Sequence, residues 1–306
     1  MRKEFAEKII EVATKEKDLV FLTADLGYMT LEKVKETLQD RFINMGVAEQ
    51  SMVSSAAGLA HEGFKVIAYS IAPFIVYRPL EQIRNDVCFH NKSVFIVGNG
   101  GGYGYGIMGS SHHCIEDIAV LSCLPNMTCY VPAFIEDLYL SIDQIFEKST
   151  PAYLRLGLGK PNPFKENKQS LDPTLLINET AKLTIVGSGP VLNNLIEVLD
   201  VNPALKTQID LFRIVEFPVN ELDENILQSI HKTNRLLIIE EHVSVGGLGQ
   251  QISVQVLKNE LEIKRFKHLY ALGYPDGLYG DQKFHQKQSG LDAENIFKTI
   301  QDLIND

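Results

Sequence analysis

A single carboxylate, of a type that could exchange protons, stands near the start of an otherwise small and apolar segment. The segment is FINMGVAEQSMVSSAAGLA, residues 42–60, and the carboxylate is Glu49. The apolar spacing from 46 to 60 predicts a helix, and its apolar surface is broad enough to indicate burial. A carboxylate in the first turns of such a helix is either a capping group or a functional acid–base group. The segment alone leaves both interpretations open.

A histidine could act at the end of a glycine-rich loop, VGNGGGYGYGIMGSSHHCIED, residues 97–117. His112 precedes a predicted helix, where it is either a capping or packing residue or part of a ligand crevice. Gly104 to Gly109 formally match GxGxxG, but the match lies well past its strand and lacks an acidic partner for a ribose. A dinucleotide site is therefore not expected. A P-loop is not expected either, because no GK[ST] follows any glycine loop.

Two aromatic residues lie one helical turn apart in YSIAPFIVYRPLEQIRND, residues 69–86. Phe74 and Tyr77 are either an ordinary core pair or a stacking wall for a flat heteroaromatic ring. The pair alone does not decide between these.

The composition excludes several classes of protein. The 306 residues are 45% hydrophobic and 22% charged, as in globular proteins, and the net charge of −10 argues against a nucleic-acid partner. No apolar run is long enough for a transmembrane helix, and the charged amphipathic N-terminus is not a signal peptide. The four cysteines form no CxxC pair, so we expect reduced structural thiols, no metal site and a cytoplasmic location.

The elements that must position these residues alternate between strands and helices, which predicts an α/β fold with two doubly wound, mainly parallel sheets. A polar, proline-containing segment at 160–173 predicts a boundary between a domain at 1–165 and a domain at 174–306. Strands are predicted at 19–24, 65–70, 93–98, 127–131, 152–156, 182–187, 208–213, 235–240 and 266–271. Helices are predicted at 2–16, 47–61, 76–88, 113–124, 134–146, 191–199, 223–232, 248–258 and 292–304.

The order of the motifs resembles the C-terminal half of a transketolase over nearly the whole chain. The matching segments are ADLG (24–27), GVAEQSM (46–52), FxxYR (74–78), EQIRND (81–86), GSSHHCIED (109–117), LPNMTCYVPA (124–133) and IIEEHVSVGGLG (238–249). The resemblance implies a thiamine-diphosphate pyrimidine-binding domain followed by a transketolase C-terminal domain.

The resemblance also implies roles for individual residues. Glu49 matches the catalytic glutamate that hydrogen-bonds N1′ of the aminopyrimidine ring, and Phe74 matches the aromatic residue that stacks on that ring. Tyr77 is expected in the same cofactor pocket, and Asp25 falls where the family places an acid near the thiazolium. His112 matches a catalytic histidine that contacts the donor ketose, although the residue after it is a histidine rather than the family's glutamine.

A full-length transketolase also has a domain with a GDG motif for magnesium and diphosphate, and no GDG occurs here. The resemblance therefore implies the second subunit of a split transketolase, active only with a pyrophosphate-binding partner subunit. That partner is expected to hold most of the thiamine diphosphate and its Mg²⁺ or Ca²⁺, in a two-plus-two heterotetramer.

Several phosphate-binding positions of the family are changed. Met29, Gly100, Met108 and Leu158 stand where transketolases carry polar or charged substrate ligands, whereas Arg2 is kept and Lys160 could partly compensate. Because charge-assisted contacts contribute strongly to anion binding, the changes favour a substrate other than the usual pentose and hexose phosphates.

Three alternatives remain at this level. The same motifs suit a subunit similar to a deoxyxylulose-phosphate synthase or to the beta subunit of a 2-oxo acid dehydrogenase. A structural partner subunit without catalytic activity is the third, and the presence of Glu49, Phe74 and His112 argues against it.

Overall fold

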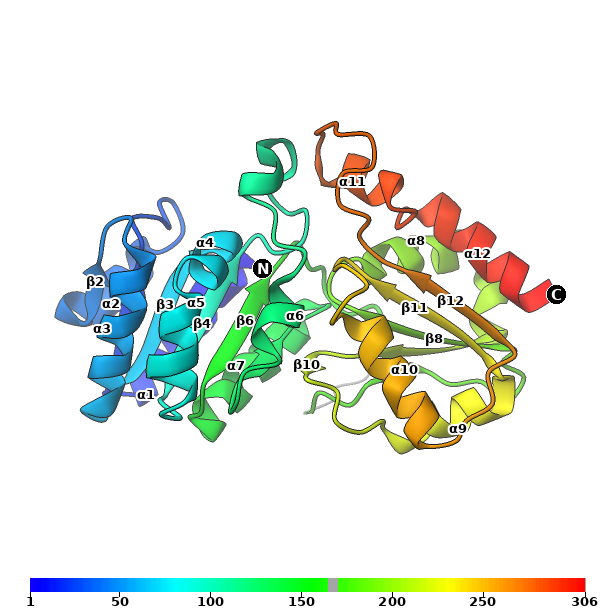
Figure 1. Ribbon diagram of the computed structural model, residues 1–306, viewed down its shortest axis with the longest axis horizontal. Helices are drawn as coiled ribbons and strands as arrows, with labels where there is room; N and C mark the ends of the chain where they lie inside the picture. Colours follow the sequence, from blue (N-terminus) through cyan, green and yellow to red (C-terminus); the bar gives the residue numbers. More distant parts are fainter. Residues whose placement is uncertain (165–169, 306) are drawn as a thin grey trace.

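The computed structural model describes residues 1–164 and 170–305. These residues form two α/β halves that lie side by side (Figure 1). Residues 165–169 of the predicted boundary segment, and the last residue of the predicted second domain, lie outside the described residues. Each half has a central sheet with helices on both faces, so the predicted fold class is confirmed.

The first sheet has the strand order β10-β5-β6-β4-β3-β1-β2 and is parallel except for β10, which runs antiparallel to β5. Its central strands are buried over most or all of their length and are rich in Val, Ile, Leu and aromatic residues, as expected for a sheet covered on both faces. The strands are β1 (Leu19–Thr23), β2 (Phe42–Asn44), β3 (Lys65–Ile71), β4 (Val94–Asn99), β5 (Thr128–Tyr130), β6 (Ala152–Leu156) and β10 (Glu216–Phe217).

Helices cover the two faces of this sheet in separate groups. Apolar side chains of α1, α2 and α7 pack on one face, and those of α3, α4, η2 and α6 pack on the other. The α-helices are α1 (Arg2–Lys15), α2 (Glu32–Leu38), α3 (Glu49–His61), α4 (Ala72–Tyr77), α5 (Leu80–Gln82), α6 (Asp117–Leu121) and α7 (Ile135–Lys148). The tighter or wider turns are η1 (Gln39–Arg41), the π-helical η2 (Ile83–Cys88) and η3 (Gly106–Ser111).

The second sheet has the order β12-β11-β8-β9-β7, with only β7 antiparallel. Helices α8 and α12 pack on one face and α9 and α10 on the other. The strands are β7 (Thr174–Leu176), β8 (Leu183–Ser188), β9 (Ile209–Arg213), β11 (Arg235–Glu240) and β12 (Arg265–Leu269). The helices are α8 (Leu192–Val201), η4 (Pro203–Thr207), α9 (Glu224–Thr233), α10 (Leu248–Lys258), α11 (Gln282–Gln288) and α12 (Ala293–Asn305).

Three predicted helices differ from the structure. The single helix predicted at 76–88 is wrong: helix α4 starts at Ala72, and Pro79, which has no N–H to donate, separates it from α5 and η2. The helix predicted at 113–124 is shorter, because its first residues lie in the glycine-rich loop. The helix predicted from 46 begins at Glu49, since Gly46 has a positive φ of 69°.

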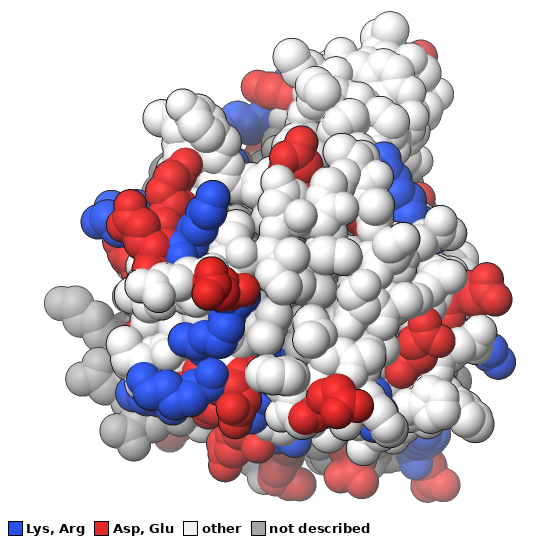
Figure 2. All heavy atoms as spheres, turned by 90° about the vertical axis from the view of Figure 1, so that its left-hand side faces the viewer, with Lys and Arg blue, Asp and Glu red and all other residues white. Residues whose placement is uncertain are grey.

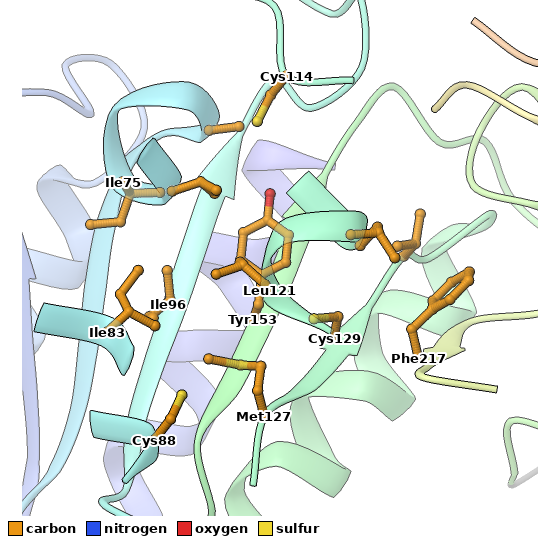
Figure 3. Close-up of a cluster of buried hydrophobic side chains, with 14 of the residues drawn as sticks. Ile75, Ile83, Cys88, Ile96, Cys114, Leu121, Met127, Cys129, Tyr153 and Phe217 are labelled. Atoms are coloured by element: carbon orange, nitrogen blue, oxygen red, sulfur yellow. The ribbon is translucent and has the colours of Figure 1, made fainter. Parts of the chain in front are cut away.

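Buried side chains from both halves meet between the sheets. Phe217 of β10 reaches the apolar cluster of the first sheet near Cys129 (Figure 3). Within the described residues, all four cysteines are free thiols, and no helix is long and apolar enough to cross a bilayer.

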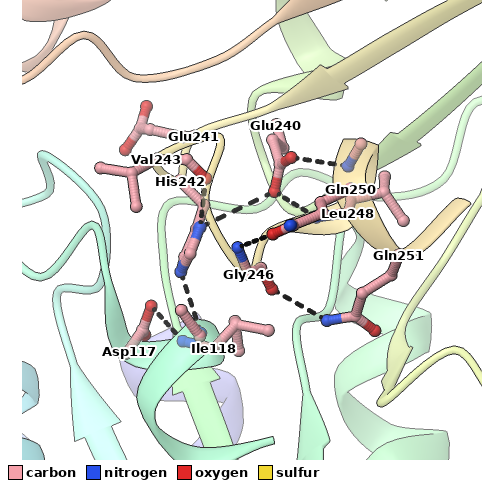
Figure 4. Close-up of polar contacts among 12 residues, drawn as sticks. Asp117, Ile118, Glu240, Glu241, His242, Val243, Gly246, Leu248, Gln250 and Gln251 are labelled. Atoms are coloured by element: carbon pink, nitrogen blue, oxygen red, sulfur yellow. Dashed lines mark hydrogen bonds and ion pairs between the residues drawn. The ribbon is translucent and has the colours of Figure 1, made fainter. Parts of the chain in front are cut away.

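Polar groups also link the halves at the end of β11 (Figure 4). Glu240 accepts hydrogen bonds from the N–H groups of Leu248 and Gly249, at 2.7 and 2.9 Å, and so caps α10. His242 accepts a hydrogen bond from the N–H of Ala119 in α6 at 3.2 Å. These contacts give the strand-to-helix turn at 240–248 a structural role.

Candidate active site

The predicted site residues of the first half follow the carboxyl ends of its parallel strands. Asp25 follows β1, Glu49 follows β2, Phe74 and Tyr77 follow β3, and His112 lies in the loop after β4. Parallel strands all end at one edge of the sheet, so residues far apart in sequence are brought to one crevice.

Glu49 is buried at the first residue of α3, with only 3% of its surface exposed. The hydroxyl of Ser70, at the end of β3, donates to Oε1 at 3.0 Å. The guanidinium of Arg78 donates to Oε2 at 2.7 Å. Glu49 accepts no capping bond from its own helix among the described contacts, so its partners are those of a site residue rather than of an N-cap.

The guanidinium of Arg78 also lies on the ring of Phe74, 3.8 Å from the ring centroid. A flat, N–H-bearing group therefore already stacks on Phe74 while donating to the Glu49 carboxylate. Glu49 and Phe74 could hold another flat group with a ring N–H in the same way. The ring would stack on Phe74, and its N–H would donate a charge-assisted hydrogen bond to Glu49.

His112 lies beside Phe74, with ring centroids 5.1 Å apart and an edge-on geometry. Its Nδ1 is 2.9 Å from the hydroxyl of Ser111. The ring of Tyr105 lies 5.7 Å away, and the Tyr105 hydroxyl accepts a hydrogen bond from Asn99 at 2.7 Å. His112 follows the 3₁₀ turn η3. It does not lie directly before a helix as predicted, because α6 starts only at Asp117.

The hydroxyl of Tyr77 bonds residues other than Glu49. It donates to Glu116 at 2.7 Å and accepts from the thiol of Cys114 at 3.4 Å. Burial, together with Cys114, Asp117 and Glu116, raises the pKa of the Tyr77 phenol, which therefore stays protonated at neutral pH.

Asp25 is exposed and has a positive φ of 55°, a conformation that Asp and Asn tolerate. The side chain of Asn44 donates to Asp25 Oδ1 at 2.9 Å and accepts from the N–H of Asp25 at 3.0 Å. The same Asn44 oxygen accepts from the N–H of Gly46 at 3.0 Å. Asn44 therefore ties the Asp25 loop to the turn that leads into Glu49.

The structure brings Arg2 to the site but not Lys160. Arg2 donates to the hydroxyl of Thr30 at 3.1 Å and lies near the phenols of Tyr69 and Tyr105. Burial raises the pKa of Tyr69 to about 12, and Arg2 acts in the opposite direction. Lys160 instead forms an ion pair of 3.3 Å with Glu197 of α8 in the second half, and its predicted substrate role stays a prediction.

The changed phosphate positions are largely apolar and exposed. Met29, Met108 and Leu158 expose 82%, 53% and 69% of their surfaces. A side chain at Gly100 would collide with the ring of Tyr105, which lies against the position of a Cβ. Tyr105 therefore takes the space of a larger residue at position 100.

Four residues of this site were not predicted from the sequence: Ser70, Arg78, Asn44 and Tyr105. Each acts through a side chain that reaches another loop, and only the FxxYR motif contained a signal for one of them. Within the described ranges, no group of three His, Cys, Asp or Glu side chains could hold a metal ion.

Fold and site together define a two-domain α/β protein whose first sheet presents a buried carboxylate, an aromatic face and a histidine at one edge. The family model for the transketolase pyrimidine-binding domain matches residues 1–160, and that for the transketolase C-terminal domain matches 174–296. The chain belongs to the transketolase family, as its motifs predicted.

Similar proteins include separate subunits of this family. The chain is 30% identical over 312 residues to one of the subunits of an apulose-4-phosphate transketolase from Phocaeicola vulgatus, covering 99% of this chain and 97% of that protein. It is 32% identical over 308 residues to a putative transketolase C-terminal section of Methanocaldococcus jannaschii, covering 98% and 95%. A solved structure described as a split-gene transketolase in an inactive beta4 tetramer superposes with a TM-score of 0.83, at 26% identity, over 99% and 97% of the two chains. These relatives are separate subunits or sections, and the present chain matches nearly their whole length.

Transketolase-family domains imply dependence on thiamine diphosphate, and the residues present fit part of that cofactor. The Glu49 carboxylate and the Phe74 face already hold one flat N–H-bearing group, so they suit an aminopyrimidine ring once Arg78 moves aside. When bound, the cofactor supplies the carbanion and the electron sink for ketol transfer.

Replacing Arg78 with alanine is expected to tighten thiamine-diphosphate binding about tenfold in the assembled enzyme. The guanidinium must leave both Glu49 and Phe74 before a ring can take its place, and a tenfold change corresponds to about 1.4 kcal/mol. Calorimetric titration would measure the change. Arg84→Ala is the matched control because Arg84 is exposed and its side chain bonds only Asn85 among the described contacts. Weaker binding of the cofactor to the Arg78 variant would show that Arg78 holds it.

Proposed function

We propose that this chain is the C-terminal subunit of a split transketolase and moves a two-carbon ketol unit from a ketose to an aldose. Glu49 is the residue proposed to activate thiamine diphosphate. The observation that carries this proposal is the buried Glu49 carboxylate, aimed at a group that stacks on Phe74. A carboxylate suits the role because it can share a proton with a ring nitrogen in a site that excludes water.

His112, whose ring meets that of Phe74 edge-on, is the proposed contact for the donor sugar and for the reacting carbons. Within the described parts of the chain its Nε2 makes no hydrogen bond, so this nitrogen can donate to a substrate hydroxyl. Asp25 and Tyr77 are the other residues proposed for the cofactor pocket.

The partner is proposed to be a pyrophosphate-binding subunit that holds Mg²⁺ or Ca²⁺ with the diphosphate, in a two-plus-two heterotetramer in the cytoplasm. The proposed division of the present chain is a pyrimidine-binding domain at 1–165 and a C-terminal domain at 174–306. Figure 2 shows a broad surface with few charged side chains in its centre, at the end of the molecule where α2 and α3 lie. Small exposed residues of α3, including Ser51, Ser55 and Gly58, suit close packing against another subunit there.

The proposed substrate is a sugar other than the usual pentose and hexose phosphates, because this site offers fewer polar or charged side chains to bind their phosphate. Arg2 is the cation at this end of the site, and its neighbours Thr30 and Tyr105 offer neutral hydroxyls. Because a similar protein is named for apulose 4-phosphate, this compound is the first donor to test. A deoxyxylulose-phosphate-synthase-like or 2-oxo acid dehydrogenase-like subunit, the remaining alternative, would use a 2-oxo acid such as pyruvate.

The test is calorimetry with thiamine diphosphate and Mg²⁺, for this chain alone and for the chain mixed with its pyrophosphate-binding subunit. We expect binding only in the mixture, followed by turnover of apulose 4-phosphate with an aldose acceptor. Turnover of pyruvate without ketose would favour the synthase alternative. Equal or faster turnover of xylulose 5-phosphate with ribose 5-phosphate would contradict the substrate proposal, and no binding in the mixture would contradict the function.

A further inference from the structure

The loop that carries His112 is packed directly on the C-terminal half of the chain. A Cβ at Gly106 would lie 3.1 Å from the backbone of Asp281, and one at Gly109 would lie 2.7 Å from the ring of Tyr279. The hydroxyl of Ser110 is 3.2 Å from that of Tyr279. Figure 1 shows the corresponding loops of the two halves rising side by side above the sheets.

His113, the residue that replaces the family's glutamine, lies at the centre of this contact. Its Nε2 is 2.7 Å from the carbonyl oxygen of Gly106, so Nε2 carries the proton and donates it. Its Nδ1 is 2.7 Å from the hydroxyl of Tyr274, which must therefore donate to the ring. One imidazole thus joins the start of the His112 turn to a tyrosine of the C-terminal domain.

The surroundings hold this imidazole in its neutral form. His113 is buried with 3% exposure, its ring stacks with Tyr274 at 5.7 Å, and it meets Tyr103 and His285 edge-on at 5.2 and 4.8 Å. Burial, with smaller effects of His285 and His112, lowers the pKa of His113 to about 4. Among the described residues no carboxylate forms a hydrogen bond or an ion pair with the ring. The hydrogen bond to the Gly106 carbonyl raises the pKa of His113, but burial is the larger effect.

The fixed ring of His113 constrains its neighbour through one peptide bond. The N–H groups of His112 and His113 both donate to the carbonyl of Gly109, at 2.9 and 3.0 Å. With His113 anchored to Gly106 and Tyr274, the position of the His112 side chain beside Phe74 is set from both sides.

We propose that His113 is a positioning residue: through Tyr274 it fastens the His112 loop to the C-terminal domain, which thereby sets the place of His112 beside Phe74. This rests on the proposed function only in that His112 acts on the donor sugar. It assigns the C-terminal domain, which contributes no residue directly to the site described above, a role in substrate turnover.

The first test compares turnover of the assembled enzyme for His113→Leu, Tyr274→Phe and His113→Gln. We expect about 10- to 100-fold lower kcat/KM for His113→Leu, about 5-fold lower for Tyr274→Phe, and a value near wild type for His113→Gln, whose amide can still donate and accept. Affinity for thiamine diphosphate should stay within twofold, since Glu49 and Phe74 are untouched. Tyr139→Phe on α7 is the matched control. Unchanged kcat/KM in the first two variants, or equal losses in His113→Gln and His113→Leu, would overturn the proposal.

The second test does not depend on activity. NMR of the chain with ¹⁵N-labelled histidine should show His113 as the neutral Nε2–H tautomer, without titration between pH 8 and 5, and Tyr274→Phe should shift its Nδ1 resonance. Titration of His113 near pH 6.5, or no response to Tyr274→Phe, would overturn the proposal whatever the substrate is. If these NMR results hold but no variant or wild-type enzyme turns over a ketose, the proposed function fails and the contact itself stands.

Discussion

Glu49→Gln is expected to lower kcat of the assembled enzyme by about 10²- to 10⁴-fold, the contribution typical of a positioned acid–base group. Glutamine has nearly the same shape and can still accept from Ser70, so the helix start is kept. It has no negative charge and cannot share a proton with a ring nitrogen. The activity should therefore be lost without loss of the fold.

The measurement is steady-state turnover together with exchange of the C2 proton of the bound cofactor in D₂O, followed by NMR. Both rates should fall by similar factors, because both depend on the same proton transfer. Glu62→Gln, at the exposed C-terminal end of the same helix, is the matched control and should remain within twofold of wild type. A Glu49→Gln enzyme with turnover within threefold of wild type would remove Glu49 from the mechanism.

Arg155→Met is expected to destabilise the chain by about 3–5 kcal/mol, the usual cost of removing one partner from a buried ion pair. Arg155 is buried between the two halves, 3.4 Å from the carboxylate of Asp117. It also donates to the carbonyl oxygens of Cys114 and Glu241, at 3.3 and 2.8 Å. Methionine fills much of the volume but leaves Asp117 as a buried charge with the Tyr153 hydroxyl, at 2.7 Å, as its remaining side-chain partner.

Urea unfolding of the full chain, followed by circular dichroism, would measure this loss. The control is Lys15→Met, which removes an exposed 2.7 Å ion pair with Glu11 and should cost about 0.5 kcal/mol or less. A difference below about 1 kcal/mol between the two variants would mean that the buried ion pair contributes little to joining the halves. The stability of Arg155→Lys should lie between those of the two variants. The lysine keeps the positive charge, but its ammonium group lacks the planar set of donors with which Arg155 reaches the carboxylate and both carbonyls.

The element pattern of this fold was largely predictable because the strongest local signals are buried parallel strands. Runs such as LVFLT at β1 and VFIVGN at β4 are mainly apolar and are buried throughout, and such runs form strands when both faces of a sheet are covered. The errors lie where local preference was weak or interrupted. Pro79 divided a predicted helix, and the two-residue strand β10 carries no signal of its own, since its place is set by pairing with β5.

The sequence by itself determined the family, the fold class and the candidates Glu49, Phe74 and His112, because catalytic residue types at fixed places in an ordered set of motifs carry that information locally. Only the tertiary structure decided how these residues are held. Arg78 meets Glu49 across 29 positions, and His113 meets Tyr274 across 161. Such contacts depend on which loops lie together at one edge of the parallel sheet and on how the two halves pack. The residue spacing within a single segment reveals neither of these.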